Sequence, residues 1–132
     1  MLGQMEGKAE IVIADFEAGL GTLSRMGPDR VDTLLVVAEP SAKSLEVARR
    51  AIDLIGQKDI GQTIVVANRV TGPEDRLAVE RAFAGSQLVV VPDDPAIRAA
   101  DAEGVAPFDA APDAPAVRLI RELAERLGAG AP

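Results

Sequence analysis

Four short apolar runs recur along the chain, and none of them alternates between apolar and polar residues. Each run is rich in β-branched residues and ends at a polar residue or a turn. Continuous runs of this kind are typical of strands buried on both faces, as in a parallel sheet. The four strands predicted in this way are residues 11–14, 33–38, 63–67 and 88–91.

Apolar residues at helical spacing separate the later strands. The predicted helices cover residues 42–55, 73–84, 95–103 and 116–127. Ser41 is expected to cap the first helix, and Thr71 and Glu74 have the spacing of a capping box around the second. Asp94-Pro95 should open the third helix and Gly104 should close it. Strands alternating with helices predict an α/β fold with right-handed crossovers.

The same pattern predicts which face of the last helix is buried, and it leaves two stretches of the chain as loops. The last helix is expected to bury Val117, Ile120, Leu123, Ala124 and Leu127. Residues 16–30 are rich in glycine and too short for a full crossover helix, so they predict a loop with a functional role. A second loop, rich in Pro and Ala, is expected over residues 105–115.

Composition narrows the possible classes of function. The 132 residues suit a single domain, and residues 128–132 are expected to form a frayed tail. The chain contains no Cys and no His, which excludes disulfides and metal sites with thiolate or imidazole ligands. Any bound metal should therefore be a hard cation held by oxygen atoms, and Mg²⁺ is expected in preference to Ca²⁺. A net charge of −7 disfavours nucleic acid as a partner. No apolar run reaches membrane-spanning length and no signal-peptide segment is visible, so a cytoplasmic protein is expected.

Polar residues follow all four predicted strands. They are Asp15, Glu39, Asn68 and Asp93. In an open parallel sheet these positions share the carboxyl edge, where ligands bind. Strand ends also need polar residues simply to leave the core, so a single such residue indicates nothing. Four of them favour a binding site at this edge.

The first of these positions opens a motif. Residues 15–19 read Asp-Phe-Glu-Ala-Gly, the Walker B and switch II pattern of P-loop ATPases of the MinD/ParA class. In such a site a carboxylate on a strand supports the Mg²⁺ that bridges the phosphates. A glycine lets a backbone N–H approach the γ-phosphate without interference from a Cβ atom. A strand end followed by a glycine turn is the simpler interpretation of this motif alone.

Further motifs follow in order and give a more specific resemblance. Residues 15–25 and the Glu-Pro-Ser helix start at 39–45 resemble segments of the CooC-type carbon monoxide dehydrogenase accessory ATPases. Residues 67–70 (Ala-Asn-Arg-Val) are similar to that family's Asn-Lys-Val, and residues 91–97 to its Pro-x-Asp loop. Ala-Asp-x-x-Gly at 100–104 completes the match. The resemblance covers residues 8–127 and identifies the chain as the C-terminal part of such an ATPase.

This resemblance implies a truncated P-loop NTPase-like sheet of about four strands flanked by helices, and a site for ATP and Mg²⁺. Asp15 would hold the outer shell of the Mg²⁺, and Gly19 would sense the γ-phosphate. Asn68 would contact the adenine edge. The residues that the resemblance assigns to the nucleotide are Asp15, Glu17, Gly19, Asn68, Pro92 and Asp93.

The sequence also departs from that family. No Gly-x-x-x-x-Gly-Lys-Ser/Thr motif occurs, so the backbone nest and lysine that bind the β- and γ-phosphates are missing. The family's Glu-His after Ala-Gly-x and its paired cysteines have no counterpart either, which leaves a nickel role unsupported. We therefore expect a partial ATP-binding domain that does not hydrolyse ATP alone. A non-catalytic interaction module that keeps the fold without binding nucleotide is the alternative.

The missing half also predicts partners. In this class the phosphate-loop strand lies between the strand before Asp15 and the next strand of the sequence. Its loss leaves a gap or forces direct pairing, and either is expected to expose a sheet edge or an apolar face that binds a helix. A homodimer, or assembly with a chain that supplies the missing N-terminal half, is expected, with a carbon monoxide dehydrogenase as a possible client. A phosphoryl receiver built on Asp15 would need an acidic pair upstream, which the sequence lacks. A membrane-targeting last helix is disfavoured because its apolar face has no aromatic residue.

Overall fold

The computed structural model describes residues 11–16, 31–56 and 60–129. Within these ranges, three parallel strands form one sheet in the order β1 (Val31–Ala38), β2 (Ile60–Val70), β3 (Gln87–Pro92). The helices are α2 (Ala42–Ile55), α3 (Gly72–Ala82), α4 (Pro95–Glu103), α5 (Pro107–Ala110) and α6 (Pro115–Ala129). The predicted α/β class with a parallel sheet flanked by helices is confirmed.

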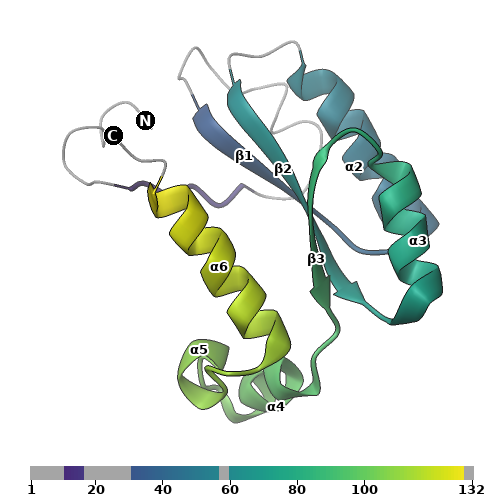
Figure 1. The fold of residues 1–132 in the computed structure, drawn as a ribbon. Helices are drawn as coiled ribbons and strands as arrows, with labels where there is room; N and C mark the ends of the chain where they lie inside the picture. Colours follow the sequence, from purple (N-terminus) through teal and green to yellow (C-terminus); the bar gives the residue numbers. More distant parts are fainter. Residues whose placement is uncertain (1–10, 17–30, 57–59, 130–132) are drawn as a thin grey trace.

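Helices cover the two faces of the sheet (Figure 1). Successive residues of a strand point to opposite faces, so β2 and β3 each contribute to two cores, whereas β1 contributes to one. Val36, Val65 and Ala67 pack with α2 and α3 on one face. Ile64 and Val91 pack with Ala116 and Leu123 of α6 on the other face. β2 therefore lies in the centre of the fold, which explains its continuous apolar sequence.

The strand predicted at residues 11–14 is wrong. Residues 11–16 have no regular secondary structure, and all six are exposed. In the described part of the chain, β1 ends the sheet on the side where this strand was expected. A strand exists only through hydrogen bonds to a neighbouring strand, and residues 11–16 pair with none of the three strands that the structure describes. An apolar run in the sequence does not show whether a neighbouring strand is there to pair with it.

The helix boundaries follow local capping chemistry, with one correction. The Ser41 side chain accepts a hydrogen bond from the Ser44 N–H at 3.2 Å, as expected of an N-cap. Gly104 closes α4 with a left-handed backbone at φ 69°. The capping box of Thr71 and Glu74 is wrong, because the Thr71 side chain makes no cap hydrogen bond. Its N–H and hydroxyl instead donate to the Asp75 carboxylate, at 2.9 and 2.6 Å.

Two further boundaries differ from the sequence prediction. The loop expected over residues 105–115 contains the short helix α5, which begins at Pro107, a residue favoured at a first helical position. Helix α6 continues to Ala129, so the first two residues of the expected frayed tail belong to the helix. The glycine-rich loop predicted for residues 16–30 lies almost wholly outside the described residues.

The contact between Thr71 and Asp75 predicts a pH dependence of stability. Two hydrogen bonds from Thr71 hold the pKa of Asp75 below its ordinary value of 3.8. The bond from the hydroxyl has the larger effect, and the bond from the backbone N–H has the smaller one. Because the folded pKa is lowered, this stabilisation is complete above the unfolded value and is lost as the pH falls through the folded one. Urea unfolding should show Asp75→Asn less stable than wild type near pH 7, with the difference shrinking below about pH 4. A difference that stays constant down to about pH 2 would contradict the assignment.

Candidate functional site

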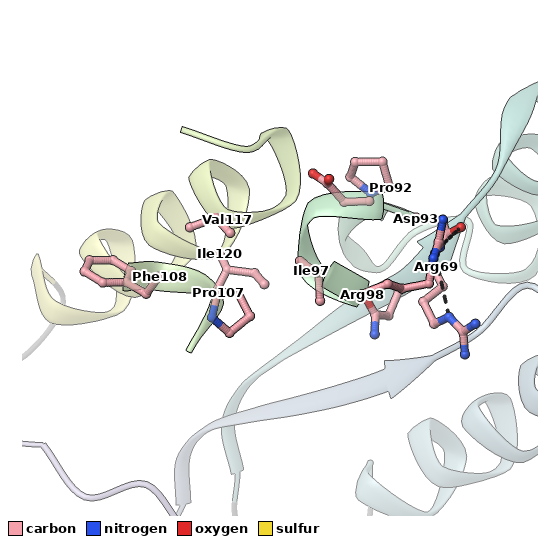
Figure 2. Close-up of a pocket in the computed structure, with 11 residues that line it drawn as sticks. Arg69, Pro92, Asp93, Ile97, Arg98, Pro107, Phe108, Val117 and Ile120 are labelled. Carbon is pink, nitrogen blue, oxygen red and sulfur yellow. Dashed lines mark hydrogen bonds and ion pairs between the residues drawn. The ribbon is translucent and has the colours of Figure 1, made fainter. Parts of the chain in front are cut away.

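A cleft of about 410 Å³ opens at the carboxyl ends of β2 and β3 (Figure 2). Strand residues line one side of it, and residues of α4, α5 and α6 line the other. Three of the predicted site residues, Asn68, Pro92 and Asp93, meet here. The full lining is Asn68, Arg69, Pro92, Asp93, Asp94, Ile97, Arg98, Pro107, Phe108, Val117 and Ile120. The edge at which the sequence predicted a site thus contains a hollow.

The backbone at the end of β2 is irregular in a way that shapes this cleft. The pairing of β2 with β3 shifts register between Ala67 and Val70. Arg69, inside this irregularity, has φ 57°, a left-handed conformation that is uncommon for a residue with a Cβ atom. The Val70 carbonyl then accepts from the Asp93 N–H at 3.0 Å and ties the two strand ends together. Asn68 and Arg69 therefore leave the regular ladder at the mouth of the cleft.

Ion pairs connect the ends of all three strands along the rim. The Arg69 guanidinium reaches two carboxylates. Its Nη1 atom lies 3.4 Å from Glu39 Oε1, and its Nε atom lies 3.8 Å from Asp93 Oδ1. Arg98, on α4, donates to the other oxygen of Asp93 at 2.5 Å. Exposed pairs of this kind add little to the free energy of unfolding. Their effect is to orient Asp93, whose side chain is only 22% exposed, between two guanidinium groups.

The opposite wall of the cleft is apolar. Figure 2 shows Pro107 and Ile120 extending from α5 and α6 toward Ile97 on α4. Ile120 is 49% exposed, so the prediction that it is buried is wrong, as it is for Ala124. Phe108 is 58% exposed and packs under the Arg121 guanidinium, whose Cζ lies 5.0 Å from the ring centroid. The sequence prediction missed this wall. The one signal for it in the sequence is Phe108 itself, because the chain has three Phe and no Trp or Tyr.

A second cleft, of about 350 Å³, adjoins the first across the ends of β1 and β2. Five of its six lining residues have polar side chains, and two of these, Arg69 and Asp93, also line the first cleft. The other lining residues are Glu39, Pro40, Ser41 and Thr71. A ligand with a flat apolar part and a polar extension could therefore occupy the two clefts together.

The remaining predicted site residues are not brought into this cleft. Asp15 is exposed and is not among the residues that line either cleft, so its role with Mg²⁺ stays a prediction. Glu17 and Gly19 lie outside the described residues. Over residues 11–16, 31–56 and 60–129, no group of three or more carboxylates that could hold a metal ion is present. Within those same ranges, no helix is long and apolar enough to cross a membrane.

Comparison with known proteins agrees with the motifs at this edge of the sheet. No family model matches the sequence. The carbon monoxide dehydrogenase accessory protein CooC of Rhodospirillum rubrum is 33% identical over 124 residues, which is 92% of this chain and 47% of that protein. The chain is a CooC-type relative. The family resemblance read from the motifs is thereby confirmed.

Two uncharacterised ATP-binding proteins of Methanocaldococcus jannaschii are also similar. One is 33% identical over 89% of this chain and 46% of its own length. The other is 38% identical over 52% of this chain and 26% of its own length. This CooC-type chain spans about half the length of the first two curated relatives it matches.

Proposed function

We propose that the cleft between β3 and α6 binds the base of an adenine nucleotide, and that the chain is the base-binding part of a CooC-like ATP-binding protein. The observation that carries this proposal is the meeting of Asn68, Pro92 and Asp93 with an apolar wall in one cleft. The names of two relatives, both ATP-binding proteins, support the choice of ligand.

The chemistry of the cleft suits a purine. A flat ring needs apolar surfaces on its faces and a few polar groups on its edge. Ile97, Pro107 and Ile120 offer the apolar surface. The Asn68 amide can donate to one ring nitrogen and accept from the exocyclic amine, and the Asp93 carboxylate is a second acceptor. The polar cleft beside it then offers room for the ribose.

The phosphate side of the site is incomplete. Since the sequence contains no phosphate-binding loop, affinity should come from the base and the ribose. We infer that Mg²⁺ is supported by Asp15 only when a phosphate-binding segment is also present, and that the chain alone does not hydrolyse ATP. The name of the CooC relative, an accessory protein of carbon monoxide dehydrogenase, supports a role beside that enzyme. We infer that the chain acts in the cytoplasm, in carbon monoxide dehydrogenase maturation, with that enzyme as partner. We also infer that the chain forms a homodimer or assembles with a chain that supplies the phosphate-binding half.

Calorimetric titration of the chain with adenosine and with Mg-ATP tests the assignment. Both ligands are expected to bind with similar dissociation constants, of about a millimolar, because the triphosphate adds few contacts. Asn68→Ala should weaken both about tenfold, through the loss of hydrogen bonds to the base edge. Asp15→Ala is the control and should leave adenosine unaffected.

Absence of binding would contradict the proposed nucleotide site. If neither ligand binds at several times that concentration, while circular dichroism shows a folded protein, nucleotide binding is excluded. The non-catalytic interaction module would then be the function that remains. Loss of adenosine binding in Asp15→Ala would instead place the base near residues 11–16.

A further inference from the structure

Asp93 is the residue of the cleft best placed to select one purine over another. Its side chain is 22% exposed, and it lines both clefts. The Asn68 amide carries a donor and an acceptor, so it can turn either one toward a ligand and suits both 6-amino and 6-oxo purines. A carboxylate carries acceptors only. Selection of an exocyclic amine against a carbonyl oxygen should therefore depend on Asp93.

Arg98 holds this carboxylate in place. Its Nη1 atom donates to Asp93 Oδ2 at 2.5 Å, and both residues line the first cleft. Hydrogen bonds between two charged groups are about twice as strong as those between neutral groups. The Asp93 backbone is fixed as well, because its N–H donates to the Val70 carbonyl at 3.0 Å. With Oδ2 held by Arg98, the Oδ1 atom keeps acceptor capacity for a ligand.

The first turn of α4 determines where the Arg98 side chain begins. The Arg98 N–H donates to the Asp94 carbonyl at 3.4 Å. The Asp94 carboxylate accepts from the N–H groups of Ala96 and Ala116, at 3.0 and 3.2 Å, which ties this turn to α6. Figure 2 shows Arg98 and Asp93 on the same side of the cleft, away from Phe108. Arg98 therefore extends from a fixed turn back to the end of β3.

Arg69 also lies beside Asp93, but it is less suited to fixing that carboxylate. Its Nε atom is 3.8 Å from Asp93 Oδ1, which is beyond hydrogen-bond distance, and its Nη1 atom lies 3.4 Å from Glu39. Its backbone has φ 57°, so a substitution there would mix backbone effects with the loss of charge. Arg98 lies within a helix and can be replaced without that complication.

We propose that Arg98 is a positioning residue for base selection. It fixes Asp93 so that the free carboxylate oxygen accepts from the exocyclic amine of a 6-aminopurine and repels the carbonyl oxygen of a 6-oxopurine. A site built to hydrogen-bond one group rejects an analogue that lacks it, because its own polar group is then left unpaired. The inference rests on the proposed nucleotide site and names the class of base that this site selects.

Dissociation constants for adenosine and inosine, measured by NMR titration of the isotope-labelled protein, test the proposal. The wild type is expected to bind adenosine about tenfold more tightly than inosine. Arg98→Met keeps an apolar stem but removes the guanidinium, and it should reduce this preference to about threefold or less, mainly by weakening adenosine. Arg98→Lys keeps a positive charge and should restore part of the preference. Arg50→Met removes an arginine that pairs with Glu46 at 2.6 Å on α2, outside both clefts, and should leave the preference unchanged.

A double variant shows whether Arg98 acts through Asp93. In Asp93→Asn the amide can turn a donor or an acceptor toward the base, so the preference for adenosine should be lost. Adding Arg98→Met to Asp93→Asn should then leave the ratio of the two dissociation constants unchanged, because the carboxylate that Arg98 positions is absent. A further change of that ratio in the double variant would show that Arg98 selects the base directly, and the proposal would be wrong.

Two other results would overturn the inference while leaving the nucleotide site in place. Equal affinity of the wild type for adenosine and inosine would show that Asp93 does not face the 6-position of the base. Equal weakening of both nucleosides by Arg98→Met would show that Arg98 supports the fold or packs on the ring without selecting the base. If the wild type binds neither nucleoside, the proposed nucleotide site is wrong and this inference is wrong with it.

Discussion

Replacing Asp94 with alanine is expected to lower the free energy of unfolding by about 2–4 kcal/mol. Asp94 is 8% exposed and serves two helices at once. One carboxylate oxygen accepts from the Ala96 N–H at 3.0 Å, at the start of α4, and the other accepts from the Ala116 N–H at 3.2 Å, in the first turn of α6. Alanine would remove the N-cap and leave a buried N–H of Ala116 without its acceptor.

Urea unfolding followed by circular dichroism measures this loss. Asp101→Ala, an exposed position on the same helix, is the matched control and should change stability by less than about 0.5 kcal/mol. Asp94→Asn keeps one oxygen that can accept, so an intermediate loss is expected. Equal stability of Asp94→Ala and Asp101→Ala would show that the link between α4 and α6 does not stabilise the fold.

Replacing Ile120 with aspartate is expected to weaken adenosine binding by about tenfold or more, which corresponds to about 1.4 kcal/mol. The side chain forms part of the apolar wall that would cover one face of the base. A carboxylate there would have to lose its hydration against the ring, and it would add a negative charge to a cleft that already contains Asp93 and Asp94. Because Ile120 is 49% exposed, the fold should tolerate the change.

Leu77→Asp gives the matched control for this experiment. Leu77 is 46% exposed on α3 and lines neither cleft, so the same change of side chain should leave adenosine affinity unchanged. Ile120→Val, which keeps the apolar surface, should weaken binding only slightly. If Ile120→Asp binds adenosine as the wild type does, the base lies elsewhere and the apolar wall has another purpose.

Prediction from the sequence succeeded where the signal is local. The apolar runs of β1, β2 and β3, the cap at Ser41 and the closing glycine of α4 each depend on residues close in the chain. Asn68, Pro92 and Asp93 were also placed correctly at one edge, because parallel strands bring their carboxyl ends together. Prediction failed for the strand at residues 11–14 and for the burial of Ile120, because both depend on contacts with residues distant in the sequence.

The sequence by itself determined the α/β alternation, the parallel sheet and the polar residues at the ends of β2 and β3. Only the tertiary structure decided that Ile120 and Phe108 form a cleft wall, since periodicity cannot tell which part of α6 extends beyond the sheet. It also decided that residues 11–14 are unpaired and that Leu35 and Val37 of β1 are exposed. Strand formation and burial are set by neighbours far along the chain, and a local pattern does not contain them.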